Sequence, residues 1–410
     1  MTEHRWAWAE IDLEAIRANI TAFRHFVSEY AAKAAAEEKR VPKTPALMAV
    51  VKADAYGHGA VKVGRAALAA GASWLGVATV DEALELRANG ITAPVLLLSE
   101  APETALPELI AAGITCTAAS LGFLQTLSGY ALLNNEEITY HLKVDTGMNR
   151  IGIPADQAVS VIREALELPK LKLGGVFTHF ATADSARDWD AGQQLERFQG
   201  VLRRLKDIGI RPPLIHACNS AATMLIPEAH YDLVRVGISM YGLHPSDDSR
   251  EVLDLTPAMS VRARATLVKP LGMGEGVGYG LTWRAYKPVH LATLPLGYAD
   301  GIPRLGSNKL DALIALSGTR VEQVGNVCMD QLMVAAGTTD AVQTADEFVL
   351  MGAADRGADV RELAREARDH TRRKIEGFIP ADEIAEKAET ITYEILCGLG
   401  QRLEKIYLNE

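Results

Sequence analysis

A lysine stands directly after an apolar run in the segment LMAVVKADAYGHGA, residues 47–60. Most lysines are solvated surface charges, but Lys52 follows the run LMAVV, which is typical of a buried strand. Partial loss of water would lower the pKa of its amine and free it for a Schiff base or a general-base role. Lys52 is therefore the first candidate for chemistry.

Other polar residues also follow short apolar runs. They are Lys143, Asp145, Arg150, His179, Asn219, Ser220 and Arg235. In IHACNSAATM a strand-like run passes into a predicted helix whose first turn offers Ser220 and backbone N–H groups, an arrangement that suits a phosphate. Gly237 permits close backbone approach, whereas an arginine such as Arg235 at a strand end is more often an ion-pair partner than a catalyst.

Three further residue patterns could indicate a binding site, a metal site or disulfides, but none does so. The glycines of LGMGEGVGYG, residues 271–280, alternate without a strand-loop-helix context, so they predict a hairpin that presents Tyr279 rather than a phosphate loop. The histidines form no H-x-H pair and no H-x-x-x-H on a predictable helix, so no metal site is expected. The cysteines are widely spaced and predict free thiols: Cys116, Cys218, Cys328 and Cys397.

Eight β-rich runs alternate with helical patterns between residues 47 and 238. They are LMAVV, WLGVAT, PVLLLS, ITCTAA, ITYHLKV, LKLGGVFTHF, PLIHAC and YDLVRVGI. The clearest helix face comprises Leu195, Phe198, Val201, Leu202, Leu205 and Ile208. Repeated βα units favour an N-terminal (β/α)8 barrel of the TIM type, whose active face is the carboxyl end of its strands. An open doubly wound sheet is the rival, but G-x-G-x-x-G is absent after the first strand.

After about Pro257 the pattern changes to short strands divided by Gly, Pro and Asp turns. The sequence therefore predicts a barrel over residues 1–256 and a mainly β C-terminal domain over residues 257–410. Residues 31–45 and 365–377 are rich in charge and poor in apolar anchors, so they predict solvated helix ends or loops.

The bulk composition excludes several partners. A net charge of -10 argues against nucleic acid and anionic membranes, which require a basic surface. The first residues carry acids where a signal peptide is apolar, and no apolar run approaches the roughly 18 residues that span a bilayer. A soluble cytoplasmic protein is expected.

The segment AVVKADAYGHGA resembles the pyridoxal-phosphate signature of alanine racemases. KVDTGMNRIG, THFATAD, HACNSAA, RVGISMYG, VGYGLTW, LPLGYADG and GNVCMDQ follow in that family's order, so the resemblance covers nearly the whole chain. It implies a fold-type III enzyme with pyridoxal 5'-phosphate as cofactor and a head-to-tail homodimer with shared active sites. The implied reaction interconverts L- and D-alanine and supplies D-alanine for peptidoglycan.

The resemblance also implies roles for individual residues. Lys52 would hold the cofactor and act as one base, and Tyr279 of the partner subunit would act as the other, from the opposite face. His179 would bridge this tyrosine to Arg235, which would face the pyridine nitrogen. The remaining cofactor contacts would be Tyr56, Asn219, Ser220, Gly237, Ile238 and Tyr393.

Substrate contacts follow from the same resemblance. Arg150 and the Met329 backbone N–H would bind the substrate carboxylate, and Tyr298 and Met329 from the partner would narrow the entrance. Lys143 matches a position that is carbamylated in many members, although an unmodified lysine paired with Asp145 is an equally physical alternative.

Asp54, Asn149 and Asn326 depart from the residues common in the family, and Asn326 replaces a frequent arginine near Met329. Three other functions are weighed: a racemase for serine or several amino acids, a non-catalytic pyridoxal-phosphate carrier, and a fold-type III decarboxylase. The presence of Tyr279, Tyr298 and Met329 argues against the carrier, and VGYG argues against the decarboxylase.

Overall fold

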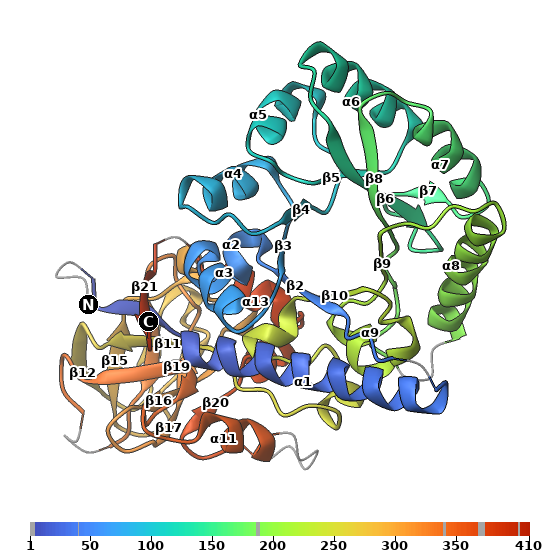
Figure 1. The fold of residues 1–410 in the computed structure, drawn as a ribbon. Helices are drawn as coiled ribbons and strands as arrows, with labels where there is room; N and C mark the ends of the chain where they lie inside the picture. Colours follow the sequence, from blue (N-terminus) through green and yellow to red (C-terminus); the bar gives the residue numbers. More distant parts are fainter. Residues whose placement is uncertain (1–4, 40, 186–188, 339–341, 368–373, 401) are drawn as a thin grey trace.

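The N-terminal barrel is drawn in blue to yellow in Figure 1. The computed structural model describes residues 5–39, 41–185, 189–338, 342–367, 374–400 and 402–410. Within these residues the ring contains eight parallel strands, which confirm the eight predicted runs. They are β2 (Ala46–Val50), β3 (Trp74–Val77), β4 (Val95–Leu97), β5 (Cys116–Ala118), β6 (Ile138–Asp145), β8 (Leu171–Phe177), β9 (Leu214–His216) and β10 (Leu233–Val236).

The ring closes through two short contacts between its halves. One half has the strand order β10-β2-β3-β4 and the other the order β5-β6-β8-β9. A parallel bridge between Leu96 and Thr115 joins β4 to β5. The N–H of Asp232 donates to the carbonyl of Ile215 at 3.0 Å and joins β10 to β9. The predicted barrel is therefore confirmed, and the open sheet is excluded.

Helices on the outside of the ring bury their apolar faces against the strands. They are α1 (Leu13–Glu37), α3 (Ala60–Ala69), α4 (Val80–Ala88), α5 (Leu106–Ala111), α6 (Leu121–Leu133), α7 (Ala158–Leu166), α8 (Trp189–Asp207) and α9 (Ser220–Leu225). Four residues of the predicted α8 face are buried, which confirms them: Leu195, Phe198, Val201 and Leu205. Ile208, the last predicted member, lies beyond the helix end and is 48% exposed.

The C-terminal part is built on a second sheet, as predicted for a mainly β domain. Its strand order is β12-β15-β18-β17-β16-β19-β11-β1-β21, and β20 pairs with β19. The strands are β1 (Ala7–Asp12), β11 (Met259–Arg264), β12 (Leu267–Leu271), β15 (Val289–Leu294), β16 (Asp311–Ile314), β17 (Arg320–Val324), β18 (Leu332–Ala335), β19 (Glu347–Ala353), β20 (Phe378–Ile379) and β21 (Glu404–Leu408). Smaller elements are the hairpin strands β13 (Gly276–Val277) and β14 (Trp283–Arg284), and the helices α11 (Val360–Glu366), α12 (Ala381–Lys387) and α13 (Thr392–Gly398).

The first strand was not foreseen as part of this sheet. β1 pairs antiparallel with β11, where Ala9 faces Val261, and parallel with β21, where Ala9 faces Lys405. The segment predicted as barrel, residues 1–256, therefore begins with a strand of the second sheet. β1 and α1 carry the chain from one sheet to the other, which fixes the two parts against each other.

The charged segments end helices, as far as the structure describes them. α1 runs to Glu37, inside the segment 31–45, and α11 ends at Glu366, inside the segment 365–377. Residues 368–373 of the latter lie outside the described residues. Among the helices that the structure describes, none has both the length and the apolar character needed to cross a bilayer.

The segment after β2 adopts a left-handed turn. Ala53, Asp54, Ala55 and Tyr56 have φ values of 52°, 51°, 54° and 53° in the element labelled α2 (Lys52–Tyr56). A left-handed helical residue other than glycine costs about 1–2 kcal/mol because its Cβ crowds the following carbonyl. Four such residues in succession require strong support from their surroundings.

That support comes from four other elements. The carboxylate of Asp54 accepts from the N–H of Ala60 at 2.8 Å and forms an ion pair with Lys405 of β21 at 2.6 Å. Glu82 of α4 accepts from the N–H of Ala53 at 2.6 Å. α13 packs against the turn where Gly57, at φ 81°, leaves room for the carbonyl of Leu396.

Gly59 provides a test of this packing. Its φ is 95°, and an added Cβ would overlap the hydroxyl of Tyr407 on β21. We expect Gly59→Ala to lower the free energy of unfolding by about 1–3 kcal/mol more than Gly113→Ala, measured by chemical denaturation. Gly113 is the matched control because it also has positive φ, 60°, but nothing lies within 4 Å of an added Cβ.

The double variant Gly59→Ala with Tyr407→Phe separates overlap from backbone strain. Removing the phenol oxygen should restore part of the loss, because the φ cost remains. Equal losses for Gly59→Ala and Gly113→Ala would show that β21 does not press on this turn.

Candidate active site

A small polar cradle lies where β10, α9 and the left-handed turn meet. Ser220, the first residue of α9, is 4% exposed, and its hydroxyl accepts from the N–H of Gly237 at 2.9 Å. A Cβ on Gly237 would stand 2.7 Å from the phenol oxygen of Tyr56, so only glycine leaves this space open. Two hydroxyls and a backbone N–H therefore converge, which is the donor set that suits a phosphate.

Aromatic rings and a helix cap define the rest of the cradle. Tyr56 lies between Tyr241, at 4.9 Å between ring centroids, and Tyr393 of α13, at 6.1 Å. Ile238 follows Gly237 and is buried. Asn219 caps α9, because its side chain accepts from the N–H of Ala222 at 2.9 Å.

The phenols of the cradle stay protonated near neutral pH. Burial raises the pKa of Tyr56 well above its usual value. Burial, followed by the charge of Asp184, raises the pKa of Tyr393 to about 12. Both hydroxyls are therefore available as hydrogen-bond donors to an anion.

Lys52 stands at the carboxyl end of β2 and begins the left-handed turn. Burial, followed by the positive charge of Arg150, lowers the pKa of its amine. Cys397 of α13 and Glu82 oppose this effect. The balance favours a larger fraction of free amine than an exposed lysine has, as the sequence predicted from the apolar run before it.

Arg235 of β10 lies at the centre of a buried chain of histidines. Its guanidinium donates to Nδ1 of His179 at 3.0 Å and to Nδ1 of His216 at 2.9 Å. It also donates to the carbonyls of Thr178 and Ala217, both at 2.9 Å. Burial lowers its pKa to about 10, so Arg235 remains a cation near neutral pH.

These contacts determine the protons on the imidazoles. Burial, followed by the charge of Arg235, lowers the pKa of both His179 and His216 well below the usual value, so both rings are neutral. Because guanidinium only donates, both rings accept at Nδ1 and carry their proton on Nε2. Nε2 of His216 donates to Nδ1 of His141 at 3.0 Å, and Nε2 of His179 remains a donor.

Lys143 is 2% exposed at the carboxyl end of β6. Burial, followed by the charge of Arg235, lowers its pKa to about 8. Its amine donates to the carbonyl of Ile151 at 3.1 Å. Asp145, offered as its partner by the sequence, instead accepts from the N–H groups of Gly147 and Asn149 at 2.9 and 3.1 Å. Arg150 follows this loop and is exposed.

The remaining predicted residues form a second, exposed group on the C-terminal part. Tyr279 is 73% exposed in the predicted hairpin, where β13 pairs with β14. Tyr298 is 43% exposed and Met329 is 53% exposed. The backbone joins these two residues, since the N–H of Ala299 donates to the carbonyl of Met329 at 3.0 Å. The barrel group is thus largely buried, whereas this group faces outward.

Several residues of the site escaped the sequence analysis. Tyr241, whose hydroxyl donates to the carbonyl of Val50 at 2.9 Å, supports Tyr56 from within RVGISMYG. His216 and His141 support Arg235, and only their place on neighbouring barrel strands could have indicated this. Lys405 forms an ion pair with Asp54, and only the pairing of β21 with β1 could have indicated it.

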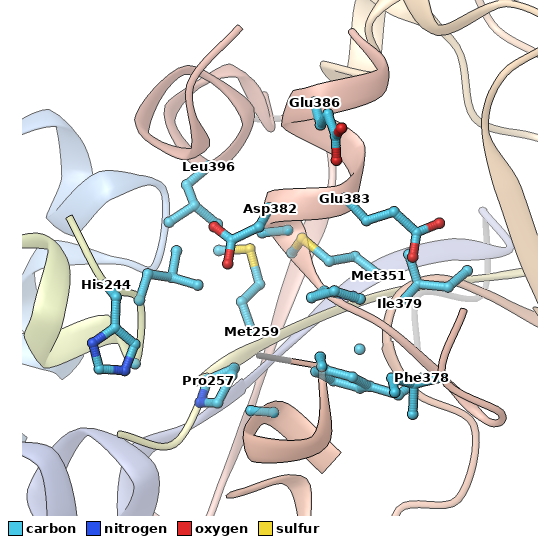
Figure 2. A pocket seen from close by; sticks show the side chains of 18 of the residues that line it. His244, Pro257, Met259, Met351, Phe378, Ile379, Asp382, Glu383, Glu386 and Leu396 are labelled. Atoms are coloured by element: carbon cyan, nitrogen blue, oxygen red, sulfur yellow. The ribbon is translucent and has the colours of Figure 1, made fainter. Parts of the chain in front are cut away.

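A separate cavity of about 690 Å³ lies between the barrel and the C-terminal part (Figure 2). His58 and Tyr241 contribute to its wall, but among the described residues around it none is a predicted site residue. Its carboxylates Asp382 and Glu383 pair with Arg250 at 2.8 Å and with Arg320 at 2.6 Å. Within the described residues, no group of three or more His, Cys, Asp or Glu side chains is arranged to hold a metal ion.

Comparisons with known proteins agree along the whole chain. Residues 11–245 match the family described as alanine racemase, N-terminal domain, and residues 258–372 match alanine racemase, C-terminal domain. The chain is 38% identical over 409 residues to alanine racemase 1 of Oceanobacillus iheyensis, with 100% of each covered.

Solved structures give the same result. Alanine racemase from the D-cycloserine producer Streptomyces lavendulae has a TM-score of 0.85 and 36% identity, covering 100% of this chain and 98% of that chain. Alanine racemase from Bartonella henselae with covalently bound pyridoxal phosphate has a TM-score of 0.81 and 27% identity, covering 98% of this chain and 99% of that chain. The chain therefore belongs to the alanine racemase family and is an amino-acid racemase.

Proposed function

We propose that the chain interconverts L- and D-alanine with pyridoxal phosphate, using Lys52 and Tyr279 as two bases. The observation that carries this proposal is the convergence of the Ser220 hydroxyl, the Gly237 backbone and the Tyr56 phenol, beside a lysine of lowered pKa. The Bartonella henselae relative holds the same cofactor covalently. Supply of D-alanine for peptidoglycan and a cytoplasmic location stay predictions.

The residues present fit this cofactor. Tyr56, Tyr393 and Ser220 would donate to its phosphate with the N–H groups of Gly237 and Ile238, while Asn219 fixes the start of α9. Lys52 would hold it covalently. When bound, pyridoxal phosphate supplies the electron sink that makes the Cα–H of an amino acid acidic.

The residues of the chain then have to remove a proton from Cα of the substrate and return one to it. Racemisation requires that one group remove the proton at Cα and that another deliver a proton from the opposite face. The free amine of Lys52 can accept or return this proton on its side. On the other side the phenol oxygen of the partner subunit's Tyr279 would do so, and His179, which retains its Nε2 proton, would link it to Arg235.

Arg235 would tune the cofactor without taking part in this proton transfer. Its guanidinium is protonated near neutral pH and is held by four hydrogen bonds. Because a guanidinium only donates, it can donate a hydrogen bond to a neutral pyridine nitrogen but cannot accept one from a protonated pyridine nitrogen. That nitrogen would therefore stay unprotonated, which limits charge build-up and suppresses side reactions.

Two substitutions test the bases. Lys52→Ala should abolish racemisation and prevent borohydride from fixing the cofactor to the chain, measured by mass spectrometry. Tyr279→Phe should keep the fixed cofactor and lower the racemisation rate by about 10²–10⁴-fold. Tyr286→Phe is the control, because Tyr286 is 71% exposed, as open as Tyr279. Full activity in either base variant would contradict the assignment.

Sharing of the active site between two subunits is the second part of the proposal. The exposure of Tyr279, Tyr298 and Met329 on the C-terminal part supports it, because these side chains are accessible to a second copy of the chain. Tyr298 and Met329 of the partner would narrow the entrance, while Arg150 and the Met329 backbone N–H would bind the substrate carboxylate.

Complementation measures this sharing. Co-expressed Lys52→Ala and Tyr279→Phe chains should form mixed dimers with one intact site, and random pairing gives about a quarter of wild-type activity. The double variant carrying both changes, co-expressed with wild-type chain, controls for the amount of dimer. No recovered activity in purified mixed dimers would place both bases in one subunit.

Carbamylation of Lys143 is the third part. In the unmodified state its amine lies among the positive charges of Arg235 and Arg150, and its pKa of about 8 provides neutral amine at mildly alkaline pH. Carbon dioxide would form a bond to the neutral nitrogen and a proton would leave. The carbamate is an anion, so it would be attracted to the two arginines, whereas the protonated lysine is repelled by them.

Carbon-13 NMR with labelled bicarbonate tests the modification. A carbamate signal should be present in the wild type and in Lys172→Met, an exposed lysine, and absent in Lys143→Met. Because only the neutral amine reacts, the signal should weaken as pH falls below about 8. A spectrum unchanged by Lys143→Met would dismiss the carbamate.

Substrate range is a narrower question. A serine or broader racemase would share this site, since a pocket separates substrates that differ by a methylene or hydroxyl by only about 10–200-fold. Among the residues that the structure describes, no contact favours serine over alanine, so alanine is the proposed substrate on the basis of the family.

A further inference from the structure

The turn that carries Tyr279 is short and has little intrinsic rigidity. Gly278, Gly280 and Leu281 have φ values of 68°, 76° and 48°. The flanking strands β13 and β14 contribute two residue pairs, Gly276 with Arg284 and Val277 with Trp283. Because glycines flank this exposed tyrosine, the backbone is flexible, and the position of the phenol oxygen is fixed only if another segment is hydrogen-bonded to the turn.

Asn326 provides this hydrogen bond to the turn. It lies in the loop after β17, and its side-chain Nδ2 donates to the carbonyl of Tyr279 at 2.7 Å. The turn lies close against this loop, since a Cβ on Gly278 would be 3.6 Å from the backbone nitrogen of Asn326. The amide therefore fixes the peptide unit directly after the Cα of Tyr279.

A network of two amide side chains, the buried Gln323 and the exposed Asn308, fixes Asn326 in turn. Gln323 is 2% exposed and donates to the carbonyls of Val324 and Gly325 at 3.2 and 2.8 Å. Its side-chain oxygen accepts from the N–H of Asn308 at 2.8 Å, and the Asn308 oxygen accepts from the N–H of Gly325 at 2.6 Å. These bonds set the backbone immediately before Asn326.

Asn308 also reaches the far end of the tyrosine turn. Its Nδ2 donates to the hydroxyl of Thr282 at 3.2 Å. The turn is therefore held at Tyr279 by one asparagine and at Thr282 by the other, and both depend on the loop that Gln323 fixes. Amides are neutral, so they anchor the turn without placing charge beside it.

We propose that Asn326 is a positioning residue for proton transfer at Tyr279. The proposal rests on the two-base function proposed above. In the step concerned, the Cα–H bond breaks, its proton forms an O–H bond with the phenolate oxygen, and its electron pair is delocalised into the cofactor that would be bound; the reverse transfer returns a proton to Cα. A displacement of the oxygen by about 1 Å costs on the order of 10²-fold in rate, so loss of the anchor should slow this transfer.

Racemisation rates do not isolate this step. The two enantiomers have equal free energy, so kcat/KM is equal in both directions for every variant, whichever base is damaged. Exchange of the Cα hydrogen with deuterated solvent does separate the bases, because each enantiomer presents that hydrogen to only one of them.

The experiment measures initial Cα exchange from L-alanine and from D-alanine with the holoenzyme. Tyr279→Phe identifies the enantiomer that depends on the tyrosine. Asn326→Ala and Asn326→Asp should lower exchange from that enantiomer by about tenfold or more and leave the other unchanged. Asn326→Asp matters because it keeps the size but sets an acceptor against the Tyr279 carbonyl.

Asn134→Ala is the matched control, since Asn134 Nδ2 also donates to a tyrosine carbonyl, that of Tyr130 at 2.9 Å, far from this turn. A second readout does not involve activity. Amide hydrogen exchange of the peptide spanning residues 276–284 should be faster in Asn326→Ala than in the wild type, and unchanged in Asn134→Ala.

The outcomes distinguish the two proposals. If Tyr279→Phe is selective for one enantiomer and Asn326→Ala lowers both equally or neither, the two-base function stands and the positioning role of Asn326 is wrong. If Tyr279→Phe is itself unselective, the two-base function is wrong and the positioning role fails with it.

Discussion

The placement of the candidate site depends on the left-handed turn at residues 53–56. This turn places Lys52 at the end of β2 and returns the chain so that Tyr56 faces Gly237. At about 1–2 kcal/mol per residue, such a turn does not persist unaided. Its support comes from α3, α4, α13 and β21, so both parts of the fold must be in place before the lysine is.

The site concentrates positive charge inside a chain of net charge -10. The pKa of His179 is lowered first by burial and then by the charges of Arg235, Lys143, Arg150 and Lys52, so these basic groups lie around one ring. Among them, Arg235 is hydrogen-bonded to His179 and to His216, both of which are neutral. An anionic cofactor and substrate are attracted locally, although the molecule as a whole would repel them.

The sequence predicts repeating features well and paired features poorly. The barrel strands and the face of α8 follow from local periodicity, which is why they were found. β1 was missed because its partners lie near residues 260 and 405, far from it in sequence. The positive φ values of residues 53–56 were missed because nothing local favours them in alanine, aspartate or tyrosine.

Side-chain partners were also hard to predict. The sequence suggested Asp145 as the partner of Lys143, but the Asp145 carboxylate accepts hydrogen bonds from the backbone of the loop at residues 147–149. Asn326 was noticed only as a departure, and its contact with Tyr279 needed coordinates.

The ion pair between Asp54 and Lys405 joins residues 351 positions apart. Contacts of this separation form late in folding, because a long loop must close before they contribute. Apart from the pairing of β10 with β2, neighbouring strands of the barrel follow one another closely along the chain. We therefore expect a growing or partly folded chain to assemble its barrel while residues 53–56 are still free to relax to ordinary conformations. The amine of Lys52 would then be presented to a scarce, reactive aldehyde only after folding is nearly complete.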